Sequence, residues 1–232
     1  MKKLLFIFAI LLSKVTFGGT IKGAWEMQAQ SSVSAEKVVM IASEKYLTIA
    51  VFEKNAFVRT YGGTYELNND GLTLKLEFDS KSKETVGTKV NYKFSRANEN
   101  TFSIENQTKT TWKRLDNGKD NLAGYWRITQ REGQDGKMNP MPFAARRTIK
   151  MLSEGRFQWI AINAETGEFF GTGGGTYTLK DGKYTENIEF FSRDNGRVGA
   201  SLTFDYKLEG DNWQHSGKSS TGNKVNEIWS RE

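Results

Sequence analysis

Three polar side chains in the second half of the chain stand where the first half carries apolar ones. The comparison begins from two similar stretches, residues 62–78 and 174–191, which share paired glycines, a turn and a hydrophobic strand. The matched pairs are Glu186 for Leu74, His215 for Ile104 and Tyr184 for Leu72. A carboxylate, an imidazole and a phenol in one interior could hold the polar end of a small ligand or transfer a proton.

A binding site built on these residues needs a partner for the carboxylate, because a buried carboxylate is costly unless it is paired. Arg147 shares a strand face with Ile149 and Met151, so we expect it to enter the same interior near one end. Apolar neighbours would hold the body of the ligand. The expected ligand-binding residues are Glu186, His215, Arg147, Tyr184, Trp159, Phe204 and Trp213. The alternative is an internal hydrogen-bonded network that only specifies the core.

Other chemistries have less support. His215 is the single histidine, and one imidazole does not make a metal cluster without further ligands. A Glu186–His215 acid–base pair remains an alternative, but no nucleophile accompanies it. The glycine-rich stretch 171–176 lacks the Lys-Ser/Thr ending of a phosphate-binding loop and leads into another strand, which favours a bend. We therefore expect no enzyme activity, no metal and no cofactor.

The elements that would position these residues are short strands, repeated twice. Leu72–Phe78 alternates apolar and polar residues with period two, as expected for a half-buried strand. Gly62 and Gly63 lie inside a strand pattern, which predicts a bulge or sharp bend. About eight such strands per repeat predict an all-β fold of two tandem small antiparallel barrels. Gln130–Ala145 is predicted to be a long loop that acts as a lid, contacts a partner or packs on its own barrel.

A Gly-x-Trp on the first strand and a Trp-x-Arg on the last strand of each repeat resemble the lipocalin and calycin barrels. The strings Gly-Gly-Thr-Tyr and Glu-Ile-Trp-Ser-Arg of the second repeat are similar to a family of secreted bacterial lipocalin-like proteins of unassigned function. The resemblance implies that an arginine packs over a tryptophan and closes one end of each barrel. The implied pairs are Trp25 with Arg114 and Trp126 with Arg231.

The expected organisation begins with a targeting segment. Residues 1–19 combine a basic start, an apolar run and small residues, as a secretory signal peptide does. We expect the first lipocalin-like barrel over 20–115, a linker over 116–121 and the second barrel over 122–232. The apolar run is too short to span a bilayer, no later segment is apolar enough, and the protein is expected in the periplasm or secreted.

Charge and cysteine content narrow the classes of partner. The formal net charge is +6, and without Lys2, Lys3 and Lys14 it is +3 (33 − 3 basic against 27 acidic residues). No basic run suggests a nucleic-acid surface. The chain has no cysteine, so no disulfide supports an exported fold.

Together these observations predict an exported, non-catalytic protein whose second barrel binds a small, apolar or amphipathic molecule. The first barrel is expected to be structural or a partner surface. The alternative is a protein–protein interaction or structural module with two solid barrels, which would expose an apolar patch and contain no cavity.

Overall fold

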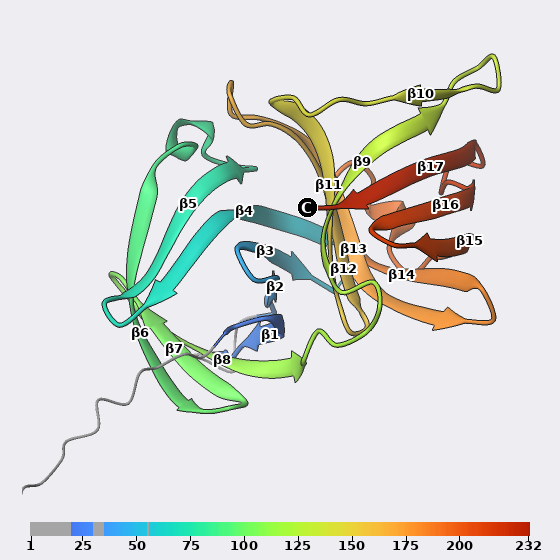
Figure 1. Ribbon diagram of the computed structural model, residues 1–232. Coiled ribbons are helices and arrows are strands. Elements are labelled where there is room, and N and C mark those ends of the chain that lie inside the picture. Colours follow the sequence, from blue (N-terminus) through green and yellow to red (C-terminus); the bar gives the residue numbers. More distant parts are fainter. Residues whose placement is uncertain (1–19, 30–34, 55) are drawn as a thin grey trace, which may run out of the picture.

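The computed structural model describes residues 20–29, 35–54 and 56–232, and it consists of two closed antiparallel barrels in tandem (Figure 1). The first barrel contains β1 (Gly23–Met27), β2 (Lys37–Ala42), β3 (Tyr46–Glu53), β4 (Ala56–Asn68), β5 (Gly71–Asp79), β6 (Lys89–Asn98), β7 (Thr101–Glu105) and β8 (Lys109–Asp116). Each strand pairs with the next, and β8 pairs with β1. The predicted signal peptide lies outside the described residues.

The second barrel repeats this order. It contains β9 (Gly124–Glu132), β11 (Arg146–Ser153), β12 (Arg156–Asn163), β13 (Glu168–Lys180), β14 (Lys183–Phe191), β15 (Ser201–Glu209), β16 (Asn212–Lys218) and β17 (Lys224–Arg231), and β17 pairs with β9. Short 3-10 turns, η1 (Lys83–Thr85) and η2 (Asn195–Arg197), follow β5 and β14. The prediction of two tandem barrels of about eight strands is confirmed.

One segment differs from its prediction. The stretch 130–145, expected to be a loop, begins inside β9 and contains a ninth strand, β10 (Met138–Pro140). β10 folds back on β9 as a hairpin, with Met138 opposite Glu132. The tight turn between them contains Gly136 at φ +74°, a conformation that glycine adopts without strain. β10 therefore extends from the barrel wall as a flap (Figure 1).

The paired glycines bend the longest strand of each barrel. The register shifts between Gly62 and Gly63 in β4, and between Gly174 and Gly175 in β13. A Cβ atom on Gly63 would collide with the carbonyl oxygen of Lys75 on β5. Glycine therefore allows the two backbones to approach at the corner where the strand passes around the barrel.

An arginine covers a tryptophan at one end of each barrel. The guanidinium carbon of Arg114 lies 4.0 Å from the ring centroid of Trp25, and that of Arg231 lies 4.2 Å from Trp126. Both indoles are fully buried and donate to a backbone carbonyl four residues earlier, at Ile21 (2.7 Å) and Leu122 (2.8 Å) respectively. Such a cation–π contact stabilises by about 0.5–2 kcal/mol.

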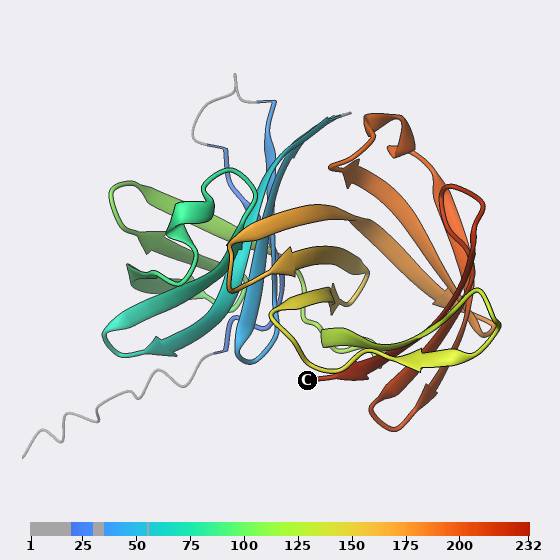
Figure 2. The same cartoon turned by 90° about the horizontal axis from the view of Figure 1, so that it is seen from above.

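Each barrel has an apolar core of its own, and a further apolar cluster lies between the barrels and joins them. It brings the outward faces of β2, β3 and β5 against those of β11, β12 and β14. Tyr46 stacks on Tyr125 at 4.5 Å, and Phe52 lies 4.8 Å from Phe190. Figure 2 shows the barrels side by side along these strands.

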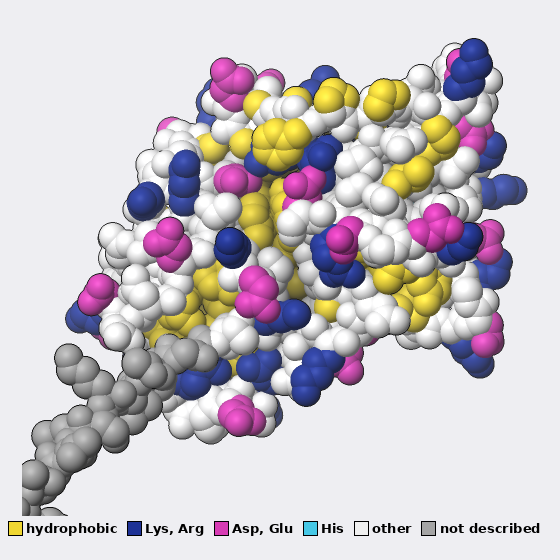
Figure 3. All heavy atoms as spheres, viewed as in Figure 1, with side chains coloured by type: hydrophobic (Ala, Val, Ile, Leu, Met, Phe, Trp, Pro, Cys, Tyr) yellow, Lys and Arg dark blue, Asp and Glu magenta, His cyan; other side chains and the backbone are white. Residues whose placement is uncertain are grey.

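Figure 3 shows acidic and basic side chains mixed over one face, with hydrophobic side chains between them.

The contacts across this interface are reciprocal. Arg147 of β11 donates to Glu77 of β5 at 2.6 Å, and the matching Lys37 of β2 lies 3.6 Å from Glu189 of β14. Each glutamate also accepts a bond from its own barrel, from Tyr46 at 3.0 Å or Arg156 at 2.5 Å. The two barrels therefore face each other with approximately twofold symmetry, and β11 is covered on both faces.

Candidate ligand-binding site

The second barrel encloses a cavity of about 900 Å³ that opens at one end. The open end lies where β11 and β13 begin and β9 ends, because residues from these segments line it. The walls include the aromatic side chains of Trp159, Phe191 and Phe204. A volume of this size is within the usual range for small-molecule sites, about 300–1,000 Å³.

A buried ion pair lies at the inner end of the cavity. Lys150 of β11 donates to Glu186 of β14 at 2.9 Å, and both side chains are almost completely buried. Four rings surround the Lys150 ammonium at 5.0–5.9 Å from their centroids: Phe157, Tyr184, Trp213 and Trp229. Lys150 therefore provides the partner that Glu186 requires, and the ring faces add cation–π contacts to the same ammonium.

A second charged group lies beside the first. Glu227 of β17 accepts bonds from Arg131 at 2.8 Å and from the indole of Trp229 at 3.0 Å, and lies 3.6 Å from Nδ1 of His215. Burial alone would raise the pKa of Glu227, but His215 and Arg131 outweigh burial and lower this pKa to about 2. Glu227 is therefore an anion at neutral pH.

His215 stays neutral at the same pH. Burial lowers the pKa of its imidazole, and the Lys150 ammonium lowers it further, against the opposing effect of Glu227 and Glu186. Its ring lies 4.1 Å from that of Phe204. Nε2 of His215 has no hydrogen-bond partner among the described residues, so the cavity contains an unpaired polar atom next to aromatic walls.

The residues predicted from the sequence occupy three kinds of position. Four line the cavity: Glu186, His215, Trp159 and Phe204. Tyr184 and Trp213 are fully buried behind this lining, with their ring centroids 5.0 Å apart. Burial and the adjacent Glu186 carboxylate raise the pKa of Tyr184. The predicted set is thus assembled along and behind the lining of one cavity in the second barrel, except for Arg147.

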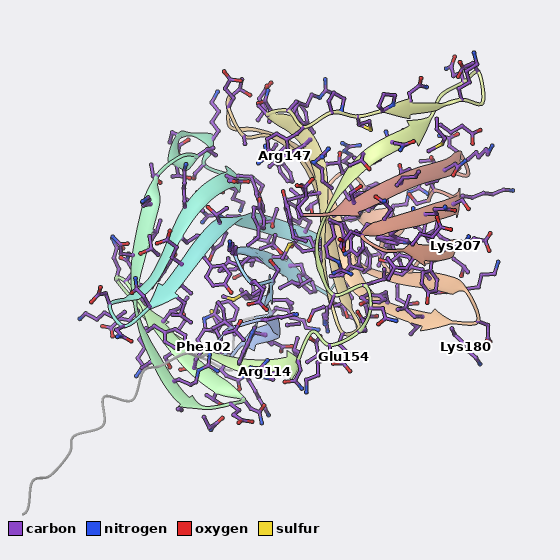
Figure 4. The ribbon with its side chains drawn as sticks, viewed as in Figure 1. Phe102, Arg114, Arg147, Glu154, Lys180 and Lys207 are labelled. Atoms are coloured by element: carbon purple, nitrogen blue, oxygen red, sulfur yellow. The ribbon has the colours of Figure 1, made fainter. Side chains whose placement is uncertain are left out.

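Arg147 is placed differently from its prediction. It touches the cavity rim, but its guanidinium points to the junction of the barrels and binds Glu77 of the first barrel (Figure 4). Ile149 and Met151, which share its strand face, belong to the apolar cluster between the barrels. Burial lowers the pKa of Arg147 and Glu77 raises it, with a net rise. The prediction that this face enters the barrel interior is wrong.

Sequence reasoning missed Lys150, Glu227 and Arg131. Strand pairing places Lys150 opposite Trp126, in the same way as Met40 lies opposite Trp25 in the first barrel. A comparison anchored on the two tryptophans could therefore have found Lys150. Glu227 lies opposite His215, where the first barrel has Thr110 opposite Ile104.

The first barrel contains apolar residues at the matched positions. Met40, Leu74 and Ile104 belong to its buried core cluster, in place of Lys150, Glu186 and His215. Nearer the other end, Ile49 lies opposite Tyr61, whereas Trp159 lies opposite Gly173 in the second barrel. The Tyr61 ring packs against the core of the first barrel, and Gly173 has no side chain to occupy the corresponding space.

Comparison with known proteins finds a family of unassigned function that matches the second barrel. Residues 121–232 match a family described as a domain of unknown function (DUF4488). The chain is also similar to a lipocalin-like protein from Bacteroides uniformis ATCC 8492, whose crystal structure was determined at 1.79 Å resolution. That similarity has 18% identity and a TM-score of 0.35, and covers 49% of this chain and 100% of the other. No curated protein matches the chain.

Two further observations concern other kinds of site. Within residues 20–29, 35–54 and 56–232, no three His, Cys, Asp or Glu side chains form a group that could hold a metal ion. In the same ranges, no helix has the length and apolar character needed to cross a membrane.

Proposed function

We propose that the second barrel binds a small, partly apolar molecule in its cavity. The single observation that carries this proposal is the open cavity of about 900 Å³, in which aromatic walls meet a few buried polar groups. Such a combination is usual for ligand sites, because apolar surface supplies the affinity and placed polar groups fix the orientation. The first barrel serves as a rigid support, since its matched positions are filled by apolar side chains.

We propose binding without catalysis. The buried carboxylates of the cavity are already paired, Glu186 with Lys150 and Glu227 with Arg131, so these groups are suited to orienting a ligand. The module with two solid barrels is less well supported, because it requires a filled second barrel. Among the residues that the structure describes, Phe143 is the most exposed large hydrophobic side chain, with 67% of its surface exposed, and it lies after β10 at the flap.

Export remains part of the proposal. Its support is the basic, apolar and small-residue order of residues 1–19, which resembles a secretory signal peptide. N-terminal sequencing of the protein recovered from the periplasm or the medium tests this point, with cleavage near residue 19 as the expected result. An uncleaved chain retained in the cytoplasm would contradict it.

The binding proposal is tested by native mass spectrometry of residues 20–232, together with a titration of the neutral fluorescent probe N-phenyl-1-naphthylamine. A filled-cavity variant, Trp159→Ile/Gly173→Tyr, copies the Ile49 and Tyr61 pair of the first barrel. We expect the wild type to bind the probe or a co-purified molecule, and the variant to lose at least about tenfold in affinity. Equal binding to a folded filled-cavity variant would overturn the proposal.

A further inference from the structure

The charges around the cavity do not cancel. Nine ionised side chains line it, six basic and three acidic. The basic ones are Arg131, Arg146, Arg147, Lys150, Arg193 and Lys224, and the acidic ones are Glu132, Glu186 and Glu227. Each carboxylate pairs with one cation of the lining: Arg131 with Glu227, Lys150 with Glu186, and Lys224 with Glu132. Arg147 pairs with Glu77 of the first barrel.

Two arginines at the rim are left over. No carboxylate of the described residues forms an ion pair with Arg146 or Arg193. Arg146 starts β11, and its guanidinium carbon lies 4.8 Å from the ring centroid of Phe170. Arg193 follows β14, and its Nε donates to the carbonyl oxygen of Phe170 at 2.8 Å. Both side chains therefore converge on one residue of β13 that also lines the cavity.

This arrangement holds the two guanidinium groups before any ligand arrives. Arg146 is stacked on a ring, and Arg193 is tied by its Nε while its guanidinium carbon lies 5.9 Å from the Trp159 ring. The terminal nitrogens of Arg193 remain available to an oxyanion. A guanidinium fixed by stacking loses less conformational entropy when it binds, and its fork of donors matches carboxylate, sulfonate and phosphate groups.

The inner end offers no comparable excess of charge. Lys150 and Glu186 cancel each other there, and His215 is neutral. The charge of Glu227 is cancelled by Arg131, which comes from the end of β9 at the opening. The apolar surface lies between this neutral end and the basic rim, with Trp159, Phe191 and Phe204 in the walls. A cationic rim around a cavity with low-dielectric walls raises the local concentration of anions.

We infer that the ligand is an amphipathic organic anion. Its acidic group binds at the rim, between Arg146 and Arg193, and its apolar body lies along the aromatic walls toward His215. This inference rests on the proposed function and adds the charge and the orientation of the ligand. A neutral apolar molecule would occupy the same walls but would gain nothing from the two arginines.

The test uses two probes with one shared body. The anion 8-anilinonaphthalene-1-sulfonate and the neutral N-phenyl-1-naphthylamine differ by a sulfonate group. Both are titrated into residues 20–232 as wild type, as Arg146→Gln/Arg193→Gln, and as a charge-matched control, Lys180→Gln/Lys113→Gln. Lys180 ends β13, far from Phe170 at the other end of the strand, and Lys113 lies on β8 of the first barrel. Figure 4 shows Lys180 at the end of the barrel remote from β10.

We expect the double arginine variant to bind the sulfonate probe about tenfold more weakly and the neutral probe almost unchanged. The control should leave both affinities within about twofold. Raising the salt concentration from about 50 mM to about 500 mM should weaken the binding of the sulfonate probe only.

The outcomes separate this inference from the proposed function. If the filled-cavity variant loses the neutral probe but the arginine variant keeps the sulfonate probe, the inference is wrong and the binding function stands. Equal weakening of both probes in the arginine variant also overturns the inference, because the arginines would then act on the shape of the site. If the filled-cavity variant keeps the neutral probe, the proposed function fails first.

Discussion

The two barrels share the order of their eight wall strands and most of the strand register, yet one is filled with apolar side chains and the other is hollow and charged. Both are closed at one end by an arginine over a tryptophan, and both bend at paired glycines. These shared features lie in the backbone corners and the closed end. The interior positions are free to differ because each side chain there contacts its neighbours across the barrel and leaves strand pairing unaffected.

The difference is coordinated across several strands. Met40 and Leu74 give way to Lys150 and Glu186, which lie on β11 and β14 and meet as an ion pair. Either charge alone would be buried without a partner, so the two replacements are expected to depend on each other. The comparison therefore predicts which changes are tolerated singly and which only in pairs.

The largest effect is expected from breaking this ion pair. Glu186→Leu leaves the Lys150 ammonium buried without its carboxylate, and we expect the free energy of unfolding to fall by about 3 kcal/mol, the lower end for a buried pair because the cavity admits water. Lys150→Met/Glu186→Leu restores the Met40 and Leu74 pair, and its stability should return to within about 1 kcal/mol of wild type or exceed it. Urea unfolding followed by circular dichroism measures both. Additive losses in the double variant would show that the two residues are independent.

The next largest effect is expected from filling the cavity of the second barrel. Gly173 faces the indole of Trp159, and a Cβ there would lie 2.7 Å from the indole nitrogen. The filled-cavity variant removes that conflict with Trp159→Ile and adds the ring that Tyr61 supplies in the first barrel, while the Phe191 ring, 2.9 Å from the same Cβ, has to shift. We expect at least about a tenfold loss in affinity for the neutral probe. Tyr61→Phe in the first barrel is the matched control. An equal loss of affinity in that variant would show that the probe binds in the first barrel.

The two reciprocal interface pairs should differ in strength. Arg147 is almost fully buried and binds Glu77 at 2.6 Å, so Arg147→Ala is expected to lower the free energy of unfolding by about 2 kcal/mol. Lys37 is about one-third exposed and lies 3.6 Å from Glu189, so Lys37→Ala should cost below about 1 kcal/mol. Thermal and urea unfolding of both variants give the comparison. Equal losses would contradict the assigned asymmetry.

Arg147→Ala also tests the role predicted from the sequence. If its guanidinium serves the interface, the neutral probe should bind the variant with nearly unchanged affinity. A selective loss of binding with unchanged stability would return Arg147 to the ligand site.

The sequence was sufficient for the architecture because its signals are local. Alternation in Leu72–Phe78, the bend at Gly62 and Gly63, and the recurring Gly-x-Trp each specify backbone geometry without reference to distant contacts. The flap was missed because β10 has only three residues and contains Pro140, which weakens any strand pattern.

The site was predicted less completely because both faces of β11 are buried. In Ile149–Leu152 the interior and the interface between the barrels both demand buried residues, and a sequence pattern does not distinguish them. A shift of one residue exchanges the two faces of a strand. That shift placed Arg147 inside and left Lys150 unnoticed, although Glu186 and His215 were found from their changes against Leu74 and Ile104.

The smallest expected effect is the pH dependence of stability that His215 gives the second barrel and that Ile104, at the matched position, does not give the first. Its neighbours are Lys150, Glu186, Glu227 and Tyr184, and burial with Lys150 holds the pKa of His215 below its ordinary value of 6.5. The unfolded chain therefore takes up the proton first, so stability should fall as pH drops below about 6.5, by at most about 1.4 kcal/mol per pH unit. Because the chain has one histidine, His215→Ile should remove this loss between about pH 7.5 and about pH 5.5 in urea unfolding. The loss from Glu227, with its pKa of about 2, falls below pH 4.5 and should become smaller in the variant, because His215 is one of the groups that lower this pKa. An unchanged slope in His215→Ile would mean that carboxylates, and not the imidazole, set the acid side of the stability curve.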